Sequence, residues 1–272
     1  MLISAYILPH SPILIPSIGK QNNSLLTKTS EALAIIKKEL IDQNIDTLII
    51  ISPHKKNNLD INLNAHFEFS LNFEEFGDYS NRLNLPGDIS LAYQIKESAA
   101  PDFSLKLEAE SEADYGANIP LYLLLSENKQ KIKDFKGKII IINTSLKKDL
   151  KEHFALGQKI YQELENNQKR IALIASAELS HCLSRSAPGG FFQKASLFDD
   201  KTIENLKKGP AGIEALLDTD PKLALEAKEC GLRPIALLLG IIGQNDFSPE
   251  RLAYQKDLGI GYLTMRLAKW NK

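Results

Sequence analysis

Three of the five histidines in this 272-residue chain occupy similar positions in the sequence pattern. His10, His54 and His181 each follow, within a few residues, a short aliphatic run typical of a buried strand. In open α/β sheets ligands bind beyond the carboxyl ends of the strands, where distant parts of the chain meet. An imidazole can bind a metal ion or transfer a proton near neutral pH. We therefore expect these three histidines to face one cleft.

Prolines stiffen the turns that present two of these histidines, in Pro9-His10-Ser11-Pro12 and Pro53-His54. Proline fixes φ and removes a backbone donor, so it ends a strand and restricts the turn that follows. Such rigidity suits a metal ligand, which must be held before the ion arrives. The alternative is a histidine that only satisfies backbone groups at a strand end. That alternative explains one such histidine more readily than three.

The third ligand of such a site has two candidates, Glu229 and Cys230. They precede a strongly apolar helix that the pattern predicts over residues 235–242. Glu229 could point into the cleft, or it could be a first-turn acid stabilised by the helix dipole. The choice matters because two imidazoles with a carboxylate suit oxygen-activating Fe(II), whereas a thiolate favours zinc or copper.

The other two histidines are predicted to have ordinary roles. His66 lies on the polar side of an alternating segment, and His153 follows a charged helix start, so we expect them to be solvated or to cap a helix. The common short motifs are absent: there is no Walker loop, no HExxH and no paired CxxC, and Gly259-Ile260-Gly261 lacks the third glycine of a dinucleotide loop.

Aliphatic runs alternating with helical patterns predict an α/β fold with a mainly parallel sheet covered on both faces. The expected strands are residues 2–8, 47–51, 138–142, 170–175 and 259–265, and a further helix is expected over residues 25–41. Residues 61–73 alternate between apolar and polar, which predicts a long half-exposed strand or a bulged hairpin outside the main sheet. Without a repeat or linker, one domain over residues 1–272 is the favoured organisation.

The composition excludes several classes of protein. With 33 Lys+Arg against 34 Asp+Glu, the chain has no basic footprint for nucleic acid. Its longest apolar run, residues 235–242, is far shorter than the ~20 residues that span a membrane. No signal peptide is apparent, and two cysteines make no disulfide framework, so we expect a cytoplasmic protein. A homo-oligomer is compatible with the sequence, which requires none.

Seven short motifs together resemble the class III extradiol ring-cleavage dioxygenases. This superfamily includes the catalytic subunit of protocatechuate 4,5-dioxygenase (LigB type) and is related to the Memo proteins. The motifs are Pro9-His10-Ser11-Pro12, Ser52-Pro53-His54, Asp114-Tyr115-Gly116-Ala117-Asn118-Ile119-Pro120-Leu121, Ala177-Glu178-Leu179-Ser180-His181, Phe198-Asp199, Glu229-Cys230-Gly231 and Gly259-Ile260-Gly261-Tyr262. Each is weak alone, but their order and spacing over nearly the whole chain are fairly specific.

The resemblance implies a three-layer αβα fold, a smaller antiparallel excursion and a non-haem Fe(II) ion. By analogy His10, His54 and Glu229 are the metal ligands, and Glu229 is favoured over Cys230 because it completes a triad of two histidines and a carboxylate. His181 then corresponds to the acid–base histidine and Glu178 to a supporting acid. Their substrates would be a catechol-type aromatic and O2.

Two further residues are candidates for substrate binding. Tyr115 stands where many ring-cleaving members have a histidine, and a phenol is a poor base at neutral pH. Arg185 could bind a substrate carboxylate or could be a solvated charge.

Three other functions stay open at this point. Memo-type relatives use a cysteine near the third ligand, which allows a metal-binding protein without ring-cleaving activity. A zinc hydrolase with the same ligands is a second alternative, and a non-enzymatic domain with structural histidines is a third.

Overall fold

The computed structural model describes residues 1–56, 59–100, 102–127, 130–131 and 134–270. The strands are β1 (Leu2–Leu8), β2 (Thr47–Ser52), β3 (Ile61–Asn64), β4 (Glu68–Phe73), β5 (Asp78–Pro86), β6 (Leu105–Glu108), β7 (Ser126–Glu127), β8 (Gln130–Lys131), β9 (Lys138–Asn143), β10 (Ile171–Ser176), β11 (Glu250–Gln255) and β12 (Tyr262–Lys269). The α-helices are α1 (Pro16–Gly19), α2 (Thr27–Asp42), α3 (Ile89–Ala99), α4 (Tyr115–Leu125), α5 (Leu150–Glu165), α6 (Ala195–Lys207), α7 (Ile213–Leu217), α8 (Pro221–Ala227) and α9 (Leu232–Ile242). Short 3-10 segments cover Pro12–Leu14, Lys20–Leu26, Glu74–Phe76 and Gly209–Gly212.

The main sheet is mixed and mostly parallel. Over the described ranges, eight strands follow the order β11-β12-β1-β10-β2-β9-β3-β6. The central strands β1, β10, β2 and β9 are parallel neighbours. Every residue of β1, β2 and β10 is buried, as expected for parallel strands covered on both faces. The predicted α/β class with a mainly parallel sheet is therefore confirmed.

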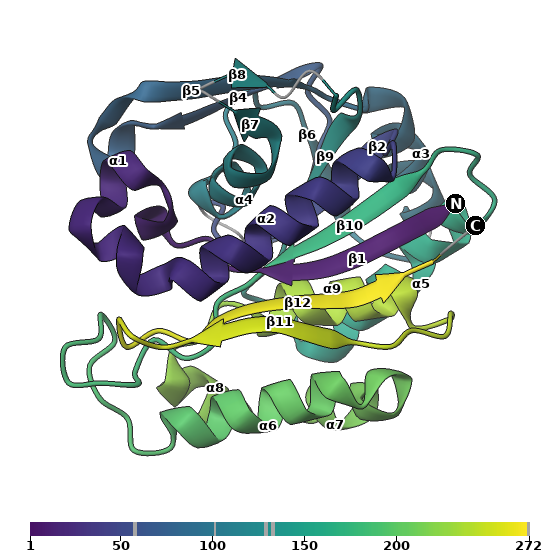
Figure 1. Ribbon diagram of the computed structural model, residues 1–272. Coiled ribbons are helices and arrows are strands. Elements are labelled where there is room, and N and C mark those ends of the chain that lie inside the picture. Colours follow the sequence, from purple (N-terminus) through teal and green to yellow (C-terminus); the bar gives the residue numbers. More distant parts are fainter. Residues whose placement is uncertain (57–58, 101, 128–129, 132–133, 271–272) are drawn as a thin grey trace.

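Helices cover both faces of this sheet and complete three layers (Figure 1). Helices α2 and α4 pack on one face, whereas α9 and α5 pack on the other. Alternation along the strands supplies both cores. In β2, Ile49 and Ile51 join one apolar cluster, while Leu48 and Ile50 join the cluster on the opposite face. The continuous aliphatic runs are thus a consequence of burial on two sides.

The excursion predicted over residues 61–73 has a different form from the one expected. β3 enters the main sheet between β9 and β6, whereas β4 pairs with β5 in a separate antiparallel sheet. The smaller antiparallel sheet is confirmed, but a single long strand or a bulged hairpin over this range is wrong. Both strands have the same two-residue period, so the pattern does not reveal the break between them.

The order of the central strands brings distant residues together at one edge of the sheet. β10 lies between β1 and β2, and all three run parallel, so their carboxyl ends share that edge. His10 lies two residues beyond β1, His54 two residues beyond β2, and the segment that leads to His181 leaves β10. Within the described part of the chain, no helix has both the length and the apolar character needed to cross a membrane.

Candidate metal centre

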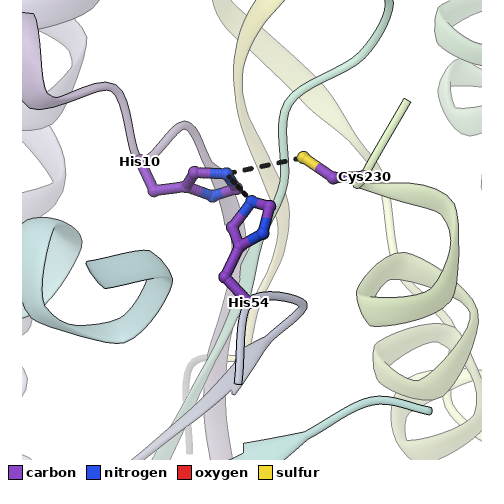
Figure 2. A group of neighbouring side chains, drawn as sticks. All are labelled: His10, His54 and Cys230. Carbon is purple, nitrogen blue, oxygen red and sulfur yellow. Dashed lines mark hydrogen bonds between the residues drawn. The ribbon is translucent and has the colours of Figure 1, made fainter. Parts of the chain in front are cut away.

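Two histidines and one cysteine converge beyond this edge of the sheet (Figure 2). The Nε2 atom of His10 lies 2.9 Å from Nε2 of His54 and 3.4 Å from Sγ of Cys230. Nitrogens bound about 2.0–2.1 Å from one ion lie roughly 3.0–3.4 Å apart, and a thiolate at about 2.3 Å lies slightly further away. The spacing of these three donor atoms therefore fits a single transition-metal ion.

A hydrogen-bond chain fixes the tautomer of His10. Its Nδ1 lies 2.8 Å from Oγ of Ser176, the last residue of β10. The hydroxyl of Ser176 donates its only proton to the carbonyl oxygen of Gly116. Ser176 must therefore accept from His10, which places the imidazole proton on Nδ1 and leaves the Nε2 lone pair free for a metal.

His54 is oriented by the first turn of α4. Its ring stacks on Tyr115 with centroids 4.4 Å apart and planes inclined by 17°. The next residue is Gly116, where a Cβ would overlap Ser52 Oγ and lie 3.2 Å from the His54 ring. A glycine is therefore required at this position, because the helix approaches the end of β2 so closely. Asp114 begins α4 by accepting from the Ala117 N–H.

Both imidazoles are held neutral. Burial, followed by the positive charge of His181, lowers the pKa of His10 from 6.5 to about 3. Burial and the charge of His10 lower the pKa of His54 to about 3 as well. A neutral imidazole is the form that binds a metal, so these two side chains are ready as ligands at neutral pH.

Cys230 reaches the group through a loop that packs tightly against the segment after β10. Its N–H donates to the carbonyl oxygen of Glu178 at 3.4 Å. A Cβ at Gly231 would lie 2.8 Å from that same oxygen, so the glycine permits the approach. Burial and then the charges of Glu178 and Glu229 raise the pKa of the Cys230 thiol well above its usual value. A bound cation would reverse this effect and favour the thiolate.

Glu229 is not among the described residues whose donor atoms converge on one point. One carboxylate oxygen accepts the N–H of Leu232 at 2.7 Å, within the first turn of α9. Burial raises the pKa of this carboxyl group. The structure therefore places Glu229 in the helix-terminal position that the sequence left open as an alternative, and it brings Cys230 to the histidines instead.

His181 and Glu178 form an acid–base pair beside the metal ligands. Glu178 Oε2 lies 3.1 Å from His181 Nε2 and 3.8 Å from His10 Nε2. Burial acts to lower the pKa of His181, but the hydrogen bond and charge of Glu178 outweigh it, and the pKa is raised. The other oxygen of Glu178 is buried and has no hydrogen-bond partner among the described residues. This arrangement can hold or transfer one proton next to a bound ion.

The group opens onto a small cavity of about 370 Å³, whose lining includes His54, His181 and Cys230. A second cavity of about 550 Å³ lies on the Tyr115 side of His54. Both volumes are within the range of small-molecule sites. A larger hollow of about 960 Å³ is lined by residues at the amino ends of β2 and β9, away from the histidines.

Comparison with known proteins identifies the family of this chain. Residues 4–264 match the family described as the catalytic LigB subunit of aromatic ring-opening dioxygenase. The chain belongs to this LigB family. The predicted resemblance to LigB-type dioxygenases is thereby confirmed.

Two similar proteins have no stated function in their names. "Protein CA_C1420" of Clostridium acetobutylicum is 29% identical over 273 residues, which cover 96% of this chain and 56% of that protein. This LigB-family chain thus spans about half the length of that curated relative. The crystal structure of uncharacterized protein JW3007 from Escherichia coli K12 aligns with a TM-score of 0.64 at 16% identity, over 98% of this chain and all of that one. At that identity the likeness supports the fold alone.

The remaining histidines of this LigB-family chain lie outside the group. His66 bonds to the backbone of Glu68 through Nδ1 and is half-buried. His153 is fully buried rather than solvated: its Nδ1–H donates to the carbonyl oxygen of Asp149, and its Nε2 accepts from the Ser145 N–H. Burial lowers its pKa to about 4, so it is a neutral bridge at the start of α5.

The structure separates the two residues suggested for substrate binding. Tyr115 stacks on His54 and lines the larger of the two adjacent cavities. Arg185 is exposed and lines neither of them. Sequence reasoning missed Ser176 and the cationic pair Lys228 and Arg233 that lines the smaller cavity. Their positions in the sequence could have pointed to them. Ser176 ends a buried strand, and the two cations lie on either side of Glu229-Cys230.

Proposed function

We propose that this chain is a metal-dependent dioxygenase that opens a catechol-type aromatic ring with O2, using Fe(II) held by His10, His54 and Cys230. The observation that carries the proposal is the convergence of these three donor atoms beside the His181–Glu178 pair. Membership of a family of aromatic ring-opening dioxygenases supports it. Bound iron would supply the electron transfer between the ring and oxygen, which amino-acid side chains cannot provide.

The chain's own residues would manage the proton and the orientation of the substrate. His181 is the proposed base for a substrate hydroxyl, since its ring borders the small cavity and is half-buried. Glu178 would hold that ring in place and stabilise its charged form through the 3.1 Å contact. Tyr115 would form an aromatic wall and keep His54 oriented.

Cys230 is the proposed third ligand in place of Glu229. The distance of 3.4 Å between Cys230 Sγ and His10 Nε2 supports it, as does the engagement of Glu229 with the Leu232 N–H. If this is correct, Cys230→Ser lowers metal affinity strongly, and Glu229→Gln leaves it nearly unchanged. The reverse pattern, measured by metal content after dialysis, would restore the carboxylate as ligand.

Activity is tested by loading metal-free protein with Fe(II) under anaerobic conditions and then admitting O2. We expect oxygen uptake and a yellow ring-opened product with at least one member of a catechol panel. His181→Ala should retain iron and lose turnover, because its proposed role is in proton transfer. Iron-loaded protein with no oxygen uptake across the panel would refute the ring-opening activity, and substrate turnover by a zinc form without oxygen would indicate a hydrolase.

A metal-binding protein without ring-opening activity is the second candidate, and Cys230 is the observation that favours it. A thiolate beside two imidazoles is a softer donor set than two imidazoles with a carboxylate, and it suits copper or zinc. Metal analysis of protein purified without added metal distinguishes the two. Copper or zinc retained by His10, His54 and Cys230, with no oxygen uptake, would support this candidate.

A further inference from the structure

Two cations line the cavity beside the candidate metal centre without forming a direct ion pair. Lys228 and Arg233 both line the cavity that also contains His54, His181 and Cys230. No carboxylate of the described residues lies within ion-pair distance of either one. Within the described part of the chain, both side chains instead donate to carbonyl oxygens, which do not neutralise their positive charge.

These backbone contacts position both cations at the cavity. Lys228 Nζ donates to the carbonyl oxygen of Gly189 at 3.0 Å, and Arg233 Nε donates to that of Lys148 at 3.3 Å. The bond at Nε leaves the two terminal nitrogens of the guanidinium group of Arg233 without a partner in the described chain. A guanidinium held in this way presents a planar pair of donors, which matches the oxygens of a carboxylate or a phosphate.

The other charged groups of this cavity are already engaged. Lys55 pairs with Glu108 and Glu110. Glu229 also lines the cavity, where it accepts the Leu232 N–H, and the charge of Arg233 acts to lower its pKa against the larger effect of burial. Glu178, which does not line this cavity, bonds to His181. Lys228 and Arg233 thus bring two positive charges to a cavity where the nearby free carboxylate is that of Glu229, so the excess charge is positive.

We propose that Arg233, assisted by Lys228, binds an anionic carboxylate or phosphate group of the substrate, while the remainder of the substrate occupies the cavity next to the metal. This inference rests on the proposed function in one respect, which is that the reacting group lies at His10, His54 and Cys230. A cavity of about 370 Å³ takes a small molecule, so the anion and the reacting group belong to the same compact ligand. The arginine assigned to this role is thus Arg233 and not the exposed Arg185.

Isothermal titration calorimetry with 3,4-dihydroxybenzoate and catechol tests the proposal. The two probes share the diol, and only the first has a carboxylate. We expect the metal-loaded protein to bind 3,4-dihydroxybenzoate roughly 10-fold more tightly, the effect of one charge-assisted hydrogen-bonding contact. Arg233→Gln should abolish that advantage and leave catechol affinity within about twofold. Inorganic phosphate, used as a competitor, shows whether a phosphate occupies the same position.

Two further variants make the result specific. Arg251→Gln removes an exposed arginine of β11 that lines neither cavity, and it should behave as wild type. Loss of the carboxylate preference in Arg185→Gln, with the preference intact in Arg233→Gln, would overturn the assignment. Equal affinity of the wild-type protein for both probes would also overturn it.

The same titrations on metal-free protein separate this inference from the proposed function. Carboxylate binding that depends on Arg233 but is accompanied by no oxygen uptake in the iron form would refute the dioxygenase and retain the anion site. Oxygen uptake with catechol, together with carboxylate binding that does not depend on Arg233, would retain the dioxygenase and refute the anion site.

Discussion

Ser176→Ala tests whether the hydrogen bond behind His10 prepares the metal centre. In the native protein Ser176 accepts the Nδ1–H of His10 and donates to the Gly116 carbonyl oxygen. Alanine removes both bonds while it keeps the buried backbone of β10. The imidazole of His10 then loses the partner that sets its tautomer, so Nε2 no longer carries the free lone pair in every molecule.

The expected magnitudes follow from these contacts. Loss of an outer partner of a metal-binding histidine lowers metal affinity by roughly 10–100-fold. The unpaired Nδ1–H of His10 and the carbonyl group of Gly116 are buried, which costs about 1–3 kcal/mol of folding stability. With metal at about 100 times the native dissociation constant, native protein gains about 2.7 kcal/mol on binding, and the variant should gain only about 0.4–1.4 kcal/mol.

The assay is chemical unfolding with and without added metal, together with direct titration of the metal. Ser145→Ala is the matched control, because Ser145 is a buried serine just after β9 whose hydroxyl donates to the carbonyl oxygen of Leu59 and bonds to no candidate metal ligand. We expect that control to lose some stability and to retain full metal affinity. A folded Ser176→Ala protein with native metal affinity would refute the reasoning that this bond prepares His10.

Three other substitutions test the scaffold. Burial acts to raise the pKa of Asp88, but the hydrogen bonds from Lys169 and other groups outweigh this effect, so the pKa is lowered. The ionised carboxylate therefore stabilises the fold at pH values above 3.8, its pKa in the unfolded chain. Asp88→Asn should cost about 2 kcal/mol at pH 7, and urea titrations should show the difference from wild type shrinking as the pH falls below that value. His153 has a folded pKa of about 4 against 6.5 unfolded, so its contribution is present above pH 6.5 and is lost as the pH falls towards 4. His153→Gln should therefore reduce the loss of stability of metal-free protein between pH 7 and pH 5 by about 2 kcal/mol; an unchanged loss would contradict the neutral bridge. Gly116→Ala should lower thermal stability by about 1–3 kcal/mol and weaken metal binding, since its Cβ would press on the His54 ring; native behaviour in both measurements would show that the close packing is unimportant.

The sequence was a good guide to the central strands and a poor guide to the small sheet. The aliphatic runs of β1, β2, β9 and β10 were recognisable because burial on both faces requires continuous apolar residues. Residues 61–73 kept one two-residue period across two strands that belong to different sheets, so the break between β3 and β4 had no local signal. Burial of His153 was equally hidden, because the segment before it is charged and exposed in part.

The sequence by itself determined which residues could reach the site. His10, His54 and His181 follow strands whose hydrophobicity makes them central, and parallel central strands end at one edge of a sheet. Only the tertiary structure decided between Glu229 and Cys230 as the neighbour of these histidines. Adjacent residues in a turn point in different directions, and the direction of each depends on the contact of Gly231 with the segment after β10 and on the Leu232 N–H. Those contacts join segments about 50 residues apart, as in the bond between Cys230 and Glu178, so no pattern within the loop could have revealed them.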